Sequence, residues 1–303
     1  MKSSIRLCYI LVCLVAPFFG SAIAQNLDTA KIEQNIGLKG VLNTNEGVFK
    51  VTSPRTDVKI SVDGWTMPPF MGLASWAAFT EQKAGDVMVM GDTVLFQDEV
   101  NPVMSAALDN GLSVTALHNH FFFDEPKVYF MHISGSGDAG KVSTAVRKAW
   151  DKVKEIRAAK PQPATSFGGT PLPAQNTITS NDIENVLGFK GQANNGMFKV
   201  VIGRATKMPC GCEMGKDMGV NTWAAFAGAD DNALVDGDFA VLEDELQPVL
   251  KSLRHDGINI VAIHSHMSQE NPRILFLHYW GRGKTADLAK GLKAALATQK
   301  NVK

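Results

Sequence analysis

Apolar residues recur along the chain with two periods, one typical of β-strands and one typical of amphipathic helices. In the first half of the chain the pattern predicts strands at 48–52, 58–62, 75–80 and 86–96. A helix is predicted at 98–108, where Pro102 is tolerated because it lies in the first turn. Two further apolar segments, 113–121 and 127–134, predict a β-hairpin.

The last predicted helix of this half has one apolar stripe whose residues are spaced three and four apart. The stripe consists of Val142, Val146, Ala149, Trp150, Val153 and Ile156. The second half of the chain ends on a similar stripe, formed by Leu288, Leu292, Ala295 and Leu296. Each half also opens with a predicted short helix, which Gly37 ends in the first half and Gly188 in the second.

The elements occur twice because the sequence is duplicated. Trp76-Ala77-Ala78-Phe79 returns as Trp223-Ala224-Ala225-Phe226, and Gly91-Asp92 returns as Gly237-Asp238. Because this motif alternates as a buried strand does, Trp76 and Trp223 are expected in the core. The pattern predicts an α+β fold, a tandem duplication of an antiparallel-sheet domain with helices on one face.

The duplication also predicts the domain organisation. The first repeat domain is expected at 28–157 and the second at 181–300. Residues 158–180 contain four prolines among Ala, Ser, Thr and Gly, which is the composition of a linker.

Residues 1–24 have the pattern of a secretory signal peptide, with Lys2 and Arg6 before an apolar run and a small-residue end at Ala24. We expect cleavage after Ala24 and export to the periplasm or the extracellular space. No other apolar segment is long enough to span a membrane, so the mature chain of 279 residues is expected to have no membrane span. It would carry 28 basic and 30 acidic residues, and this near-neutral charge does not favour nucleic-acid binding.

Six of the seven histidines lie in two copies of one motif, at a constant offset of 146 residues. Each copy has His-x-His, a turn that ends in Pro, and a third His twelve positions after the second. The six are His118, His120, His132, His264, His266 and His278. Residues two apart on a strand share a face, so the first two histidines of each copy are expected to point the same way.

The predicted turn, centred on residue 125, would place His118 opposite His132 and Phe130 opposite His120. The three imidazoles of each repeat would then lie on one face within about 5–8 Å of one another. Three imidazoles with an open position suit Zn²⁺, Fe²⁺ or Cu²⁺, so we expect one tri-histidine metal site in each repeat. In the alternative interpretation, the histidines are structural and bind turn and backbone groups.

Several acidic residues could complete such a site. Glu125 and Glu270 follow the His-x-His pairs and could act as a fourth ligand or, in an enzyme, as the catalytic base. Two groups on the preceding segments could also supply carboxylates, although helix capping is the commoner role for them. They are Asp92 with Asp98-Glu99, and Asp238 with Asp244-Glu245.

Cleavage of the signal would remove Cys8 and Cys13 and leave Cys210 and Cys212, close to Met208 and Met214. Two thiols with thioethers form a soft ligand set that suits Cu(I). In an exported protein the thiols can instead form a disulfide. A third interpretation has inert thiols beside packing methionines.

A set of motifs resembles the LppY/LpqO-type family of bacterial exported proteins, and the resemblance covers both repeats. They are Trp76-Ala77-Ala78-Phe79, Gly91-Asp92, Asp98-Glu99-Val100-Asn101-Pro102-Val103, Ala116-Leu117-His118-Asn119-His120 and Phe130-Met131-His132. The resemblance implies an exported, duplicated protein and brings no established activity. Because lipoproteins of this family have a lipidated Cys that this chain lacks, we expect a protein that is free in the periplasm.

Three functions are compatible with these observations. The first is a periplasmic metal-binding protein that handles or senses a transition metal through the six histidines. The second is a metal-dependent enzyme, either a Zn hydrolase or a cupin-like non-haem Fe oxygenase, that uses the same histidines. The third is a module that binds a small-molecule ligand or another partner, with structural histidines.

Overall fold

A computed structural model describes residues 27–83 and 85–300, so the predicted signal peptide lies outside the described residues. The first repeat contains, in chain order, α1 (Thr29–Ile36), β1 (Gly40–Asn43), β2 (Val48–Pro54), β3 (Ser61–Val62), β4 (Trp65–Thr66), η1 (Pro69–Met71), β5 (Ala74–Lys83), β6 (Asp86–Phe96), α2 (Gln97–Asp109), β7 (Ser113–His118), β8 (Asp124–Glu125), β9 (Val128–Asp138) and α3 (Ala139–Ala159).

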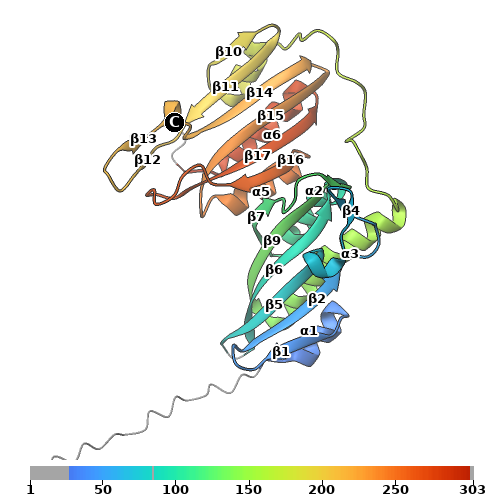
Figure 1. The fold of residues 1–303 in the computed structure, drawn as a ribbon. Coiled ribbons are helices and arrows are strands. Elements are labelled where there is room, and N and C mark those ends of the chain that lie inside the picture. Colours follow the sequence, from blue (N-terminus) through green and yellow to red (C-terminus); the bar gives the residue numbers. More distant parts are fainter. Residues whose placement is uncertain (1–26, 84, 301–303) are drawn as a thin grey trace, which may run out of the picture.

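The second repeat follows the same order, except that it has no strand that corresponds to β8 (Figure 1). It contains α4 (Ser180–Leu187), β10 (Gly191–Asn194), β11 (Met197–Gly203), β12 (Thr206–Lys207), β13 (Glu213–Met214), η2 (Lys216–Met218), β14 (Asn221–Ala229), β15 (Asn232–Leu242), α5 (Leu246–His255), β16 (Asn259–His264), β17 (Ile274–Gly283) and α6 (Thr285–Ala297).

The main strands of both repeats form one twelve-stranded sheet within the described residues. Its strand order is β1-β2-β5-β6-β9-β7-β16-β17-β15-β14-β11-β10. The strands of the second repeat therefore follow those of the first in the opposite order of equivalent strands. The repeats join where β7 pairs antiparallel with β16 in the register Leu117↔Ile263. These two residues are 146 positions apart and are therefore equivalent, which places an approximate twofold axis at this pair.

The helices cover one face of this sheet, as the sequence predicts (Figure 1). Val146 of α3, Val249 of α5 and Leu292 of α6 are among the buried residues of one hydrophobic cluster that spans both repeats. Leu117 and Ile263 belong to the same cluster, so they point toward the helices. His118 and His264, one position further along, therefore point to the helix-free face, which we call the open face.

Gly37 and Gly188 end α1 and α4 in the left-handed conformation, with φ of 76° and 82°, as predicted. Trp76 and Trp223 were expected in the core, and this expectation is wrong. Both are only partly buried, on the open face, with Lys50 and Lys199 placed over their rings at 4.6 and 4.3 Å. In each Trp-Ala-Ala-Phe motif the second and fourth residues are the buried ones. The predicted alternation along the strand is therefore correct, but the buried and exposed faces are the reverse of the prediction.

The strand predicted at 58–62 is shorter in the structure and is not part of the main sheet. Only Ser61–Val62 is a strand, and it pairs with β4 and β8 in a small three-stranded sheet. Val58 and Ile60 pack instead into a second cluster with Val94 and Phe130, on the open-face side of β6 and β9. This small sheet draws the loop after His120 away from a tight hairpin.

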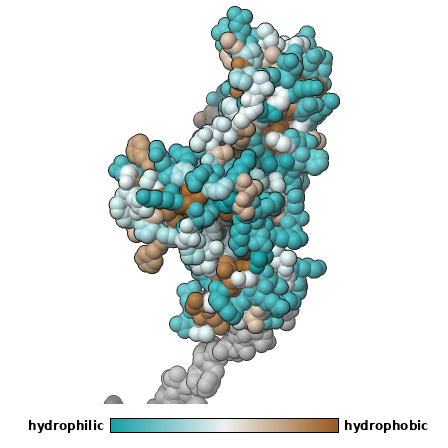
Figure 2. All heavy atoms as spheres, turned by 90° about the vertical axis from the view of Figure 1, so that its right-hand side faces the viewer, coloured by the Kyte–Doolittle hydropathy of each residue, from teal (hydrophilic) through white to brown (hydrophobic). Residues whose placement is uncertain are grey.

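The segment between α3 and α4 runs along the outside of the molecule and touches both repeats (Figure 1). The backbone N–H of Ala164 donates to Asp98, while Arg282 donates to the carbonyl of Gly168 at 2.9 Å. The surface shown in Figure 2 is mainly hydrophilic, with separate apolar patches. Among the described helices, none is both long enough and apolar enough to cross a membrane.

Candidate metal centre

The two His-x-His motifs lie at the middle of the sheet, at the ends of β7 and β16. The predicted register is wrong by two residues: His118 pairs with Phe130, and His132 pairs with Ala116. The pairing is centred on residue 124, one position before the predicted centre, and the second repeat, which has no strand equivalent to β8, has the same register, with His264 paired with Phe276. A shift of two positions keeps every side chain on its face, so the histidines still gather.

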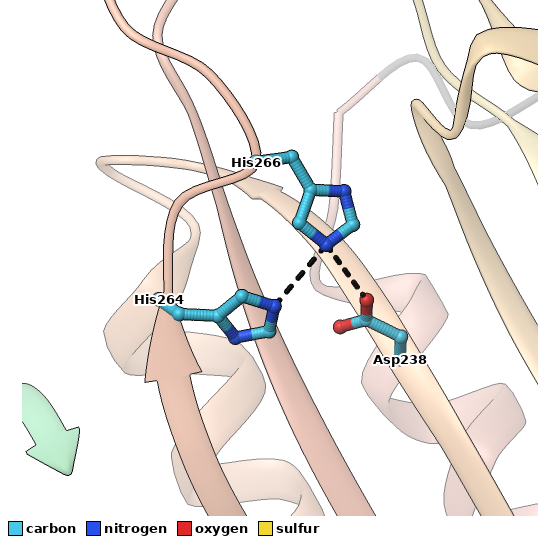
Figure 3. Close-up of side chains that lie close together, drawn as sticks. All are labelled: Asp238, His264 and His266. Atoms are coloured by element: carbon cyan, nitrogen blue, oxygen red, sulfur yellow. Dashed lines mark hydrogen bonds and ion pairs between the residues drawn. The ribbon is translucent and has the colours of Figure 1, made fainter.

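In the second repeat, three ligand atoms converge from three segments (Figure 3). His264 Nε2 lies 3.1 Å from His266 Nε2, which lies 3.4 Å from Asp238 Oδ2. One ligand atom from each residue lies within 4.8 Å of the others. Asp238 comes from β15, His264 from the end of β16 and His266 from the loop beyond it. These residues form a cluster that could hold a metal ion.

Two contacts fix the ring of His266, although it lies beyond the end of a strand. The ring stacks on Phe276, with 3.5 Å between centroids and 10° between planes. Its Nδ1 lies 3.3 Å from the carbonyl oxygen of Gly219. If Nδ1–H donates to this carbonyl, neutral His266 presents the lone pair of Nε2 to the cluster. Metal-binding histidines are usually oriented by a bond of this kind at the other ring nitrogen.

Burial shifts the pKa values of Asp238 and His264 toward the uncharged form of each group. Asp238 is 2% exposed, and its Oδ1 has no hydrogen-bond partner among the described residues. Burial raises the pKa of this carboxyl, while the charges of His278 and His266 act in the opposite direction. Burial, together with the charges of His278 and His266, lowers the pKa of His264 to about 4. His264 is therefore neutral near pH 7, as a metal ligand must be.

His278 lies beside the cluster and contributes no atom to it. Its ring stacks on that of His264, with centroids 4.8 Å apart and planes at 9°. Its Nδ1 lies 3.2 Å from the carbonyl oxygen of Gly237. Asp238 pairs with His278 across the sheet and takes the place that the tri-histidine prediction gave to His278. Two roles were predicted for Asp238, helix capping and a carboxylate beside the histidines. The position of Asp238 agrees with the second role.

The first repeat has the equivalent residues in a more open arrangement. His118 lies 5.2 Å from His120 and 5.1 Å from His132 between ring centroids, within the predicted distance. His120 stacks on Phe130 at 3.3 Å, as His266 does on Phe276. Asp92, which is 6% exposed, pairs with His132, and its Oδ1 has no partner in the described part of the chain. Burial lowers the pKa of His120.

The ring orientation distinguishes the two repeats. His118 Nδ1 lies 3.4 Å from the carbonyl oxygen of Asn119, and its ring is nearly parallel to that of His120, at 17°. In the second repeat the corresponding rings are inclined by 46°, which brings their Nε2 atoms face to face. Only the second repeat therefore has a preformed cluster within the described residues.

The other acidic candidates have different contacts. Glu125 is exposed on β8. Glu270 is 6% exposed and accepts a hydrogen bond from the backbone N–H of Ile274 at 3.2 Å, while its Oε2 has no partner among the described residues. Glu99 accepts a hydrogen bond from the backbone N–H of Phe96 at the start of α2 and pairs with Arg55. Glu245 accepts one from the backbone N–H of Leu242 at the end of β15 and pairs with Arg204. The helix-capping interpretation is confirmed for Glu99, which accepts from the N-cap backbone of α2, whereas the side chain of Glu245 makes no cap hydrogen bond to α5.

Cys210 and Cys212 are free, exposed thiols at the tip of the β12–β13 hairpin. A hydrogen bond with Cys212 lowers the pKa of Cys210. The base of this hairpin binds the loop that follows His266, because Lys207 and Asn271 exchange backbone hydrogen bonds of 3.1 and 2.9 Å. Met214 is partly buried and packs against the apolar cluster that contains Phe276.

Sequence reasoning did not identify the two residues that orient His266. Phe276 had a signal, since Phe130 and Phe276 keep the same offset of 146 as the histidines. The carbonyl of Gly219 had none, because any residue supplies a backbone carbonyl and its position depends on the neighbouring strand.

A sequence model of one protein family matches the chain twice, at residues 30–152 and 181–298. The family is described as Domain of Unknown Function (DUF1259). No curated protein and no solved structure matches the chain. The two matches agree with the duplication that the fold shows.

Proposed function

The chain belongs to the DUF1259 family, and from the geometry of its centre we propose that it is an exported protein that binds a divalent transition metal and handles or senses it. The second repeat holds the ion with Asp238, His264 and His266. Zn²⁺, Fe²⁺ and Cu²⁺ all accept this set of two imidazoles and one carboxylate. Export and membership of the LppY/LpqO-type group are part of the proposal and rest on the N-terminal pattern and the motifs.

The observation that carries the proposal is the spacing of the three ligand atoms. Tetrahedral Zn²⁺ with ligands at about 2.0–2.1 Å places neighbouring ligand atoms about 3.3 Å apart. In the cluster, His266 Nε2 lies 3.1 Å from His264 Nε2 and 3.4 Å from Asp238 Oδ2. A cation among these atoms would also satisfy the buried carboxylate of Asp238, which is otherwise costly to keep charged.

The exposure of the cluster favours metal handling over enclosed catalysis. The side chain of His266 is 35% exposed, so an ion can enter and leave from the open face without a large rearrangement. The two glutamates expected to serve as a catalytic base, Glu125 and Glu270, do not belong to the cluster.

The equivalent residues Asp92, His118 and His120 form the site of the first repeat. Occupation of that site requires rotation of the His118 ring away from Asn119, which costs the weak contact of 3.4 Å. We therefore propose that the second repeat binds the metal more tightly than the first.

The test is elemental analysis of chain purified without an affinity tag, followed by titration of the metal-free chain with Zn²⁺. Asp238→Asn should weaken binding at the tighter site about tenfold or more, since it removes the charged ligand. Asp236→Asn is the matched control, because Asp236 lies two positions earlier on the same strand and outside the cluster. Equal affinities for both variants and the unmodified chain, or no bound metal, would contradict the proposal.

A further inference from the structure

A cavity of about 430 Å³ lies at the junction of the two repeats. The first repeat contributes Tyr129 to its wall, the connecting segment contributes Phe167, and the second repeat contributes Val261 and Trp280. Cavities of this size with apolar walls and a few polar groups are the usual form of small-molecule sites. Because its walls come from both repeats, the cavity depends on the joined sheet.

The apolar part of the cavity is unusually accessible. Phe167 is 64% exposed and Val261 is 40% exposed. Val261 lies in the bulge between Ile260 and Ala262, which removes it from the pairing of β16 with β17. With Tyr129 and Trp280, these side chains would cover the body of a flat aromatic compound.

The polar side of the cavity offers hydrogen-bond acceptors. Asp236 contributes a carboxylate, and His278 contributes an imidazole. When the Nδ1–H of His278 donates to the carbonyl of Gly237, 3.2 Å away, its Nε2 is left as an acceptor. A bound compound would therefore turn a hydroxyl or amino group toward this side.

One residue of the polar side, His278, connects the cavity to the metal centre. His278 lines the cavity and stacks on His264, with 4.8 Å between ring centroids. A second cleft of about 440 Å³ lies near Arg55 and Arg157, and no histidine lines it. The cavity at the junction is thus the one that a metal-associated compound would enter.

We propose that this cavity binds a planar aromatic compound with a hydroxyl or amino group, and that this group lies beside the metal centre of the second repeat. The position beside a bound metal rests on the proposed function. Binding of the compound in the cavity does not rest on the proposed function, because every group that recognises the compound belongs to the protein.

The test uses the full chain without metal and 2-naphthol as the probe, with binding measured by calorimetry. We expect 2-naphthol to bind and 2-naphthoate to bind about tenfold more weakly, because its carboxylate would face Asp236. The variant Asp236→Asn should reduce this difference. Equal binding of the two probes, or tighter binding of 2-naphthoate, would overturn the proposal.

Val261→Trp should fill the cavity and weaken 2-naphthol binding about tenfold or more, since the apolar wall is replaced by an inserted ring. Val201→Trp is the matched control: Val201 is 39% exposed on β11 of the same sheet and lies outside the cavity. Unchanged binding to a folded Val261→Trp variant would overturn the proposal. Because these measurements need no metal, a failure of the metal proposal would leave them unaffected.

Discussion

Asn101 of the first repeat holds both backbone polar groups of Ile260 in the second. Its Nδ2 donates to the carbonyl of Ile260 at 3.0 Å, and its Oδ1 accepts from the N–H of Ile260 at 2.7 Å. Gln247, the equivalent residue, binds Val114 of the first repeat in the same way, at 2.8 and 2.9 Å. The bulges of β16 and β7 are therefore each fixed by a helix of the other repeat, as an approximate twofold axis requires.

Replacement of Asn101 by Ala should destabilise the chain by about 2–4 kcal/mol, because it leaves a buried N–H and a buried carbonyl of Ile260 without partners. Urea unfolding measures this change. Asn232→Ala is the control, since Asn232 makes one exposed hydrogen bond, to Pro171, and should cost less than about 0.5 kcal/mol. A loss in Asn101→Ala no larger than in the control would show that the side chain does not hold the junction.

The two metal sites should be separable by mutation. His118→Ala with His120→Ala should remove the weaker bound ion and leave the tighter one, while His264→Ala with His266→Ala should do the reverse. The reason is that each pair supplies both imidazoles of its own site and none of the other. Metal content after dialysis against a weak chelator measures the outcome. Loss of both ions in either double variant would mean that the repeats share one centre.

The stability of the metal-free chain should depend on pH through His264. Its pKa is lowered from 6.5 to about 4 in the folded chain, mainly by burial. As the pH falls below 6.5 the unfolded chain takes up this proton first, so stability that is present at pH 7 is lost between pH 6.5 and 4. His264→Gln should reduce the loss of unfolding free energy between pH 7 and pH 5. Parallel pH profiles for the two chains would contradict this explanation.

The buried ion pairs at the starts of α2 and α5 should differ in their tolerance of mutation. Glu245 is 1% exposed and pairs with Arg204 at 2.6 Å, so Arg204→Met should destabilise by about 3–5 kcal/mol by leaving a buried charge. Glu99 pairs with Arg55 at 2.6 Å and also with Arg157 at 2.9 Å. Arg55→Met should therefore cost less, because Arg157 remains. Unfolding curves that rank the two variants in the opposite order would exclude this account.

The sequence by itself determined the features that depend on local period and on repetition. The constant offset of 146 between the histidine motifs predicts the duplication. The spacing of apolar residues predicts the helical stripe of α3 and the bounds of β6. Alternation along a strand also predicts that the two histidines of each His-x-His motif point the same way. The inferences from apolar spacing and alternation need only neighbours within a few positions, and the duplication needs only a comparison of the chain with itself.

The tertiary structure decided the pairings between distant segments, because local periodicity carries no information about partners far along the chain. Leu117 meets Ile263 across the centre of one sheet, and Asp238 rather than His278 completes the cluster with His264 and His266. The register near His118 depends on where the loop between β7 and β9 reverses the chain, which the alternation of each strand does not specify. The histidines gather because their strands share a face, but which atoms converge depends on a register that only the folded sheet fixes.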